Sequence, residues 1–396
     1  MQSNWQTISF MKKFHFKWWK EGLHVVAITA VALLLTRCII HYAPSLGVFA
    51  PLEKEMDFET SDIYNAVKEN KSLHRSSPDV VVVSVDRHDR QQVLMDIRKI
   101  AATQPLAIGL DVHFKVYQEN LDSLLLATIL EPSNRLVGST RAIPDSCGYY
   151  EQSYMSYYEK EYNPVVGYTN IDPAQEQKVV RHFRPFVLKA NGDTLMSMEL
   201  KIASIANPEM AQQLIARGNE LEIIDYTSLK IPVIDADDLD NPDIQAWIAH
   251  KVVMIGDVRD MEDMRITPLH GYVPGVMIHA YGVETILQAS YIHTSQSWQN
   301  WLIAVGICLI FVALRLLVSR TMSNVGSLII RISQFVIMYV LIVCGCVIFE
   351  NHHSYVDFAP SVLMLGFGLL AYDIWFASYG IIMTIIDFIK KHLQKK

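Results

Sequence analysis

The sequence has few cysteines and lacks the short motifs of several common enzyme classes. Only five cysteines occur, and four of them, Cys38, Cys308, Cys344 and Cys346, lie in strongly apolar stretches. Cys147 stands alone in the polar region, so no disulfide framework can form there. The chain also contains no glycine-rich phosphate loop, no G-x-S-x-G and no H-E-x-x-H motif. These absences give no support to a disulfide-stapled domain, a P-loop enzyme, a serine hydrolase or a zinc protease.

The chain has no excess of positive charge. It carries 34 Lys and Arg residues against 41 Asp and Glu residues, which gives a net charge of −7, and its pI is about 6.0. No basic stripe runs through the polar region, so we expect no nucleic-acid partner. The spacing of His, Cys and carboxylate residues indicates no metal site, and no motif indicates a cofactor.

Long apolar runs are plentiful, and four of them have the length of membrane spans. They cover residues 23–43, 298–318, 328–349 and 358–380. About 20 apolar residues suffice to cross roughly 30 Å of hydrocarbon. The first run could instead be a cleavable signal peptide, but no small-x-small cleavage site follows it, so we expect a retained anchor. The interval 44–297 is long enough to bury a full core.

The basic residues predict the orientation of these spans. Three arginines surround the turn between the second and third spans, and four lysines lie near the end of the chain. They are Arg315, Arg320, Arg331, Lys390, Lys391, Lys395 and Lys396. The turn 350–357 has neither Lys nor Arg. Since positive residues stay inside, segments 1–22 and 381–396 are expected in the cytoplasm of a bacterium and 44–297 outside its inner membrane.

One carboxylate, Asp373, lies inside the last apolar run. Intramembrane carboxylates can act in proton or ion pathways, or they can pair with a basic residue of a neighbouring helix. The spans offer few further polar side chains for a pathway. We therefore predict a structural ion pair of Asp373 with Arg331, with Arg315 as the alternative partner.

The polar region is organised around two apolar runs that each end at a carboxylate. Residues 80–85 end at Asp86, and residues 106–110 end at Asp111. Between them, residues 89–103 have apolar side chains at spacings of three and four, which is typical of a helix. The pattern predicts a βαβ unit with adjacent parallel strands. Strands as apolar as these are covered on both faces, so the unit should lie at the centre of a sheet.

The rest of the region alternates strands and helices in the same way. Residues 164–171 and 179–189 predict a β-hairpin, and residues 141–163, rich in tyrosine, predict a long loop. A third apolar strand, 251–256, ends at Asp257, and a helix is expected over 275–289. The fold class is therefore α/β, with a central and mostly parallel sheet, plus four transmembrane helices.

Asp86, Asp111 and Asp257 form the candidate site. Each follows an apolar strand, and ligands of open α/β sheets bind at the carboxyl ends of the strands. These carboxylates could hold a cation, accept hydrogen bonds from a ligand or take part in phosphoryl chemistry. In the structural alternative, Asp86 caps the following helix and Asp111 holds a loop.

His279 and two arginines could complete this site. His279 lies in the first turns of the helix 275–289, where it could face the crevice and titrate near neutrality, or simply pack in the core. Arg181 and Arg184 could balance the charge of the carboxylates, or they could face solvent on their strand.

Several segments are similar to the type-2 CHASE domain, the extracellular sensory domain of bacterial adenylate cyclases, histidine kinases and Ser/Thr kinases. They are VVVVSVD at 80–86, AIGLDVHF at 107–114, VVGYTNID at 165–172, VVRHFRPF at 179–186, SMELKIA at 197–203, KVVMIGD at 251–257 and PGVMIHAYGVETIL at 274–287. Members of this family usually carry an output domain after the last membrane helix, whereas about 16 residues follow Gly380 here. The resemblance therefore implies a sensor that signals to a separate effector protein in trans, and it leaves a homodimer open.

Three functions remain at this point. The first is a sensor that binds a small molecule or a protein at Asp86, Asp111, Asp257, His279 and Arg184. The second is an assembly protein that binds another protein through the tyrosine-rich segment 141–163, since tyrosine is enriched at interfaces. The third is a metal-dependent hydrolase built on the three aspartates. We expect the sensor, and hence no enzyme.

Overall fold

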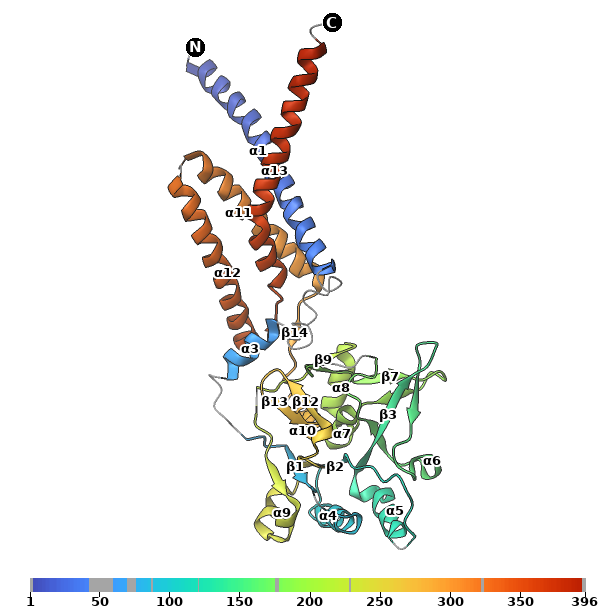
Figure 1. The fold of residues 1–396 in the computed structure, drawn as a ribbon. Coiled ribbons are helices and arrows are strands. Elements are labelled where there is room, and N and C mark those ends of the chain that lie inside the picture. The colour runs from blue at the N-terminus through green and yellow to red at the C-terminus, as the bar shows by residue number, and fades with distance from the viewer. Residues whose placement is uncertain are drawn as a thin grey trace. The chain divides into compact units, whose positions relative to one another are not determined.

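The computed structural model describes residues 3–42, 60–69, 76–86, 88–119, 121–174, 178–227, 229–321 and 324–393. The chain divides into two compact units (Figure 1). Residues 1–64 and 293–396 form the first, which we call the helical unit, and residues 65–292 form the second, the α/β unit.

Long helices make up most of the helical unit. They are α1 (Ser3–Tyr42), α11 (Ser297–Thr321), α12 (Asn324–His352) and α13 (Ala359–Leu393). The paired strands β14 (His293–Thr294) and β15 (Ser354–Tyr355) belong to the same unit, and the short helix α3 (Thr60–Glu69) crosses the division between the two units at residue 64. Four segments of these helices are long and apolar enough to cross a membrane, beginning at Trp19, Ser297, Val325 and Ala359. The four predicted apolar helices are thus present. α13 is longer than predicted, because most of the segment 381–396 continues as helix.

Apolar side chains join the long helices. Ile28 of α1, Cys308 of α11 and Met364 of α13 are fully buried in one cluster. α12 packs less extensively, mainly through Ile330 against α11 and α13. One polar contact fixes the position of α12 along α13: the Gln334 side-chain amide donates a hydrogen bond of 2.8 Å to the carbonyl of residue 365 in α13.

A seven-stranded sheet forms the centre of the α/β unit. Its strand order is β10-β1-β11-β2-β3-β4, and β5 also pairs with β3. The strands are β1 (Val80–Ser84), β2 (Ala107–Leu110), β3 (Leu136–Pro144), β4 (Tyr150–Ser153), β5 (Val166–Tyr168), β10 (Val233–Asp235) and β11 (Val252–Gly256). All pairs are parallel except β3 with β4. The predicted mostly parallel sheet is confirmed.

The expected adjacency of the first two strands is wrong, because β11 lies between them. Val82 of β1 pairs with Met254, and Val253 pairs with Ile108 of β2. Consecutive strands are neighbours in only about two-thirds of cases, and an apolar run does not reveal its partner. The insertion places β11 between β1 and β2, so Asp257 lies between Asp86 and Asp111 at the carboxyl ends of the strands.

Two groups of helices cover the two faces of the sheet. On one face, odd positions of β1 such as Val81 and Val83 pack with α4 (Arg90–Ala102), α5 (Asp122–Leu130) and α9 (Pro242–Ile248). On the other face, even positions such as Val80 and Val82 pack with α7 (Met198–Ala206), α8 (Pro208–Arg217) and α10 (Gly275–Leu287). Burial on both faces explains the continuous apolar run. α4 begins where its capping box predicts, with Asp89 and Gln92 bonded to each other's backbone.

The connecting segments differ from the prediction. The expected loop 141–163 contains the end of β3, the antiparallel strand β4 and the helical turn α6 (Glu159–Tyr162). The predicted hairpin of 164–171 with 179–189 is wrong, because β5 pairs with β3. In the second segment, β6 (His182–Phe183) pairs with β9 (Glu222–Ile223), and β7 (Phe186–Leu188) pairs with β8 (Thr194–Met196). Residues 175–177, in the middle of the expected turn, lie outside the described residues.

Gly167 in β5 lets α7 approach the sheet closely. A β-carbon on Gly167 would lie 2.5 Å from the Met198 Cα atom and 2.9 Å from the Ser197 carbonyl oxygen. Backbone atoms cannot turn aside as a flexible side chain can. By contrast, a β-carbon on Gly138 in the neighbouring strand would lie 3.6 Å from the nearest atom, an ordinary contact.

We therefore expect Gly167→Ala to destabilise the α/β unit by about 1–3 kcal/mol, the usual cost of overpacking. The matched control, Gly138→Ala, should change stability by less than about 0.5 kcal/mol. Denaturant unfolding of the purified full chain, followed by circular dichroism, measures both. Equal midpoints for the two variants would contradict the close packing of α7 on β5.

Candidate functional site

A cavity of about 610 Å³ lies at the carboxyl ends of β2 and β11 in the α/β unit. Six carboxylates line it: Asp111, Asp172, Asp257, Asp260, Glu262 and Asp263. Arg141 and Arg265, with His113 and His279, are the basic side chains of the lining. Because carboxylates outnumber the cationic groups, the cavity favours a ligand that carries positive charge or hydrogen-bond donors.

His279 is the most buried of these groups. Its Nδ1 atom lies 2.6 Å from Oε1 of Glu199 on α7, and the two side chains are 4% and 1% exposed. Burial alone would lower the pKa of His279, but Glu199, Asp111 and Asp263 raise it to about 9. The ring is therefore a cation at neutral pH, held between α10 and α7.

The glycine at 282, one turn beyond His279, makes this pair possible. A β-carbon on Gly282 would lie 2.6 Å from Cγ of Glu199, so a larger residue there would displace the Glu199 side chain. Within the described residues, neither Nε2 of His279 nor Oε2 of Glu199 has a hydrogen-bond partner. Since His279 lines the cavity, its second N–H is free to donate to a ligand.

Asp111 and Asp263 stand beside this pair. The Asp111 amide donates to the carbonyl of Ile255, but its half-buried carboxylate accepts no hydrogen bond from the residues described. Asp263 accepts a hydrogen bond of 3.1 Å from the amide of Gly275, the first residue of α10. Burial and the nearby Asp111 raise the pKa of Asp263. The Asp263 carboxylate therefore joins the cavity lining to the first residue of α10.

The structure brings together three of the predicted site residues, Asp111, Asp257 and His279. Asp86 lies outside the cavity lining because β11 separates it from Asp111. It accepts a hydrogen bond of 2.7 Å from Ser84 and forms an ion pair of 2.9 Å with Arg259. It does not cap α4, since Asp89 has that role.

The two arginines take structural positions. Arg184 does not line the cavity; its Nε atom lies 2.8 Å from Asp172, which does, and it also pairs with Glu220. It thus supports the wall. Arg181 is only 5% exposed, so it does not face solvent as one alternative required.

Sequence reasoning did not identify Glu199, the partner of His279. It lies 80 residues away along the chain. A signal was present: Glu199 stands between Met198 and Leu200 at the start of an apolar helix whose cap is Ser197. A carboxylate there must be buried, and a buried carboxylate needs a partner.

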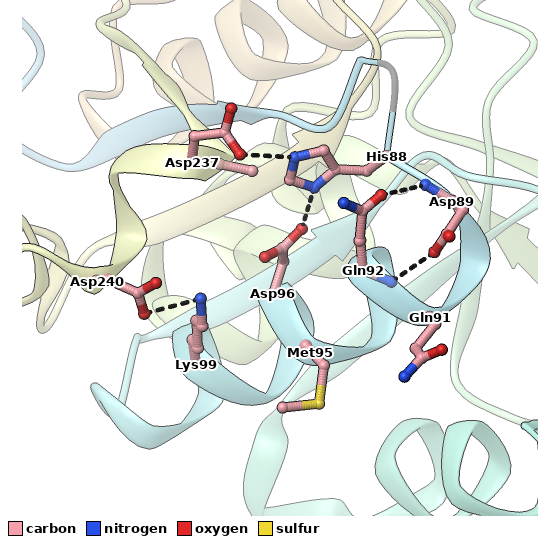
Figure 2. A pocket seen from close by; sticks show the side chains of 10 residues that line it. His88, Asp89, Gln91, Gln92, Met95, Asp96, Lys99, Asp237 and Asp240 are labelled. Atoms are coloured by element: carbon pink, nitrogen blue, oxygen red, sulfur yellow. Dashed lines mark hydrogen bonds and ion pairs between the residues drawn. The ribbon is translucent and has the colours of Figure 1, made fainter.

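A second cavity, of about 300 Å³, lies between α4 and η3 (Ala236–Asp240) (Figure 2). The His88 ring lies between Asp96, at 2.6 Å, and Asp237, at 3.2 Å, and Lys99 pairs with Asp240 at 2.8 Å. Burial would lower the pKa of His88, but the two carboxylates raise it. These charges pair with one another and thereby join α4 to η3.

The described residues contain no group of three His, Cys, Asp or Glu side chains arranged to hold a metal ion.

In the helical unit, the predicted ion pair of Asp373 with Arg331 is not formed. Both side chains are exposed, and neither has an ion pair with any residue that the structure describes. On α12 it is Gln334, one turn from Arg331, that faces α13. Arg315 is not the partner either, since its guanidinium lies over the ring of Tyr372, 4.9 Å from the centroid.

The His279–Glu199 pair makes stability depend on pH in a defined direction. The pKa of His279 in the folded protein, about 9, exceeds its ordinary value of 6.5. Its protonated ring therefore stabilises the fold fully below pH 6.5, and this contribution is lost as pH rises through 9. A shift of this size corresponds to roughly 3 kcal/mol.

We expect His279→Gln to remove most of the loss of stability between pH 6.5 and 9. The exposed control, His250→Gln, should keep it. Unfolding midpoints of the full chain at half-unit pH steps measure the difference. If the unfolding midpoint of His279→Gln depends on pH in the same way as that of the wild type, the His279 ring is not charged in the folded state.

Comparison with known proteins identifies the family. The family model of the CHASE2 domain matches residues 26–316, from the middle of α1 to near the end of α11. No curated protein and no solved structure matches the chain. The matched segment contains the whole α/β unit with its cavity, in agreement with the resemblance that the strand-end motifs indicated. The chain belongs to the CHASE2 domain family.

Proposed function

We propose that the protein is a membrane-anchored sensor whose α/β unit binds a polar ligand in the 610 Å³ cavity. The observation that carries the proposal is the buried cation at His279, whose second N–H is accepted by no described residue. His279 lines a cavity in which carboxylates outnumber cationic groups. An arrangement that costs so much desolvation is typical of functional sites. Membership of a sensory domain family supports the same conclusion.

The ligand carries both kinds of polar group. An ammonium or similar cation binds Asp111 and Asp257, which form no ion pair with a described residue. An acceptor oxygen receives the N–H of His279. Small amines, amino acids and amino sugars have this combination. The cavity volume suits a ligand of that size.

Binding acts on α10. A cation beside Asp111 and Asp263 weakens the attraction that raises the pKa of His279 and changes the charge at the first turn of α10. In the sequence, residues 288–296 connect α10 to α11. If α10 can take two placements and the ligand binds the protein more tightly in one of them, binding shifts the equilibrium toward that placement.

The charge distribution supports the proposed location. Arginines occur near residues 315–331 and lysines near the end of α13, and by the positive-inside rule such segments favour the cytoplasmic side. The α/β unit is then extracytoplasmic, at the inner membrane of a bacterium. An effector protein in trans would receive the signal from the membrane helices. The site supplies binding groups and no activated nucleophile among its described residues, so we propose no enzyme.

An assembly function is the second candidate, and one observation favours it. Tyr149 and Tyr154, on either side of β4, are 44% and 51% exposed on the hairpin that β3 and β4 form. Exposed tyrosines of this kind are common in protein interfaces. Tyr158 of the same segment is buried in the core, however, so only part of the segment is available. Crosslinking from position 154 in cells would recover a protein partner if this function holds.

Ligand binding can be tested with two aspartates that the structure separates. The purified full chain is screened against a panel of amines, amino acids and sugars, and compounds that raise its melting temperature are retained. Asp111→Asn should weaken binding of such a compound by about tenfold or more, the value of a charge-assisted hydrogen bond. The control Asp86→Asn should leave its affinity unchanged, because Asp86 lies outside the cavity.

Calorimetric titration of the retained compound measures the affinity of all three proteins. Equal affinity of wild type and Asp111→Asn would contradict the site. Weaker binding by Asp86→Asn alone would place the ligand on the other side of β11.

A further inference from the structure

Two charges of opposite sign, neither paired with a described residue, lie on the exposed surface of the helical unit. Asp373 is on α13 and Arg331 is on α12, and both helices contain candidate membrane spans. Neither charge faces the buried clusters that join the long helices. Ionisable residues within membrane spans almost always pair or face a protein interior. The exposed sides of α12 and α13 that carry these two charges therefore favour a partner of opposite charge.

The two charges lie at similar depths in the helical unit. α12 and α13 run in opposite directions (Figure 1), and the Gln334 side chain bonded to Leu365 marks a common level. At 1.5 Å per residue, Arg331 lies about 4.5 Å and Asp373 about 12 Å from this level, both toward the end at which α12 begins. The difference of roughly 7 Å along the axis is within reach of an extended arginine side chain.

We propose that a second copy of this chain covers this surface, and that Asp373 of each copy pairs with Arg331 of the other. A two-fold axis parallel to the bilayer normal keeps every residue at its own depth, so one operation forms both ion pairs. A partner of another kind would have to supply both a cation and an anion at matching depths. The chain itself already carries this pattern.

Exposed apolar side chains surround both charges. Beside Arg331, α12 exposes Leu328 at 60% and Phe335 at 70%. Beside Asp373, α13 exposes Leu370 at 49% and Ile374 at 39%. Van der Waals packing of such faces joins helices within a membrane, so they can pack together around the two ion pairs.

Charge exchange between two differently tagged full-length copies tests the interface. Asp373→Arg alone places a second positive charge opposite Arg331, and Arg331→Asp alone places a second negative charge opposite Asp373. Each variant should therefore lose self-association, measured as co-purification of the second tag from membranes in mild detergent, by at least about tenfold relative to wild type.

Co-expression of the two variants should restore co-purification to near the wild-type level. In the mixed dimer, one contact joins the two introduced charges and the other joins the native Arg331 and Asp373, so both contacts join charges of opposite sign. Recovery also shows that both chains are folded. The matched control pairs Arg331→Asp with Asp387→Arg, which lies about 21 Å further along α13. One contact of this pair still joins two negative charges, so co-purification should stay clearly below that of the complementary pair. Asp373→Asn and Arg331→Gln, which introduce no repulsion, should weaken self-association less.

Three results would overturn the proposal. One is a wild-type chain that does not self-associate. Another is self-association of Asp373→Arg at the wild-type level. The third is co-expressed variants that recover no better than either variant alone, as expected if each pair forms within a single chain.

Discussion

The structure of the α/β unit depends on the insertion of β11 between β1 and β2. This one strand supplies the backbone hydrogen bonds that join the first two strands into a sheet. It also ends at Asp257 and leads through residues 258–274 to α10, so the same insertion positions the cavity and the helix that carries His279. Without it, Asp111 would face Asp86 directly and the carboxylates would form a different site.

The charge pair of His279 with Glu199 is the second constraint, and it conflicts with the apolar core around it. Two ionised groups are buried between α7 and α10, with one oxygen and one nitrogen left unpaired by the described residues. Apolar residues of similar size would hold these helices together at least as well. The pair thus adds little to stability beyond what such residues would give, and its histidine lines the same cavity as Asp111 and Asp263.

Much of the fold could be predicted from the sequence where the cause is local. The apolar runs of β1, β2 and β11 and the spans of the four long helices follow from composition, and Asp89 and Ser197 mark helix starts through their caps. The order of parallel strands depends on tertiary packing, which composition does not reveal, and the sequence therefore did not predict that β11 lies between β1 and β2. Two-residue strands such as β6 and β9 carry no periodicity at all. In the site, the strand-end rule found Asp111 and Asp257, whereas Glu199 required knowledge of which helix faces α10.

The late position of β11 has a consequence for synthesis. Its residues follow the end of β2 by about 140 positions, so the strand pairs of highest sequence separation within the sheet lie in its middle. Until residue 256 has left the ribosome, β1 and β2 each present an unpaired, fully apolar edge, which is the kind of surface that aggregates. High contact order also makes folding slow. The central sheet can therefore close only after residues 252–256 have been made, about 40 residues before α11 begins.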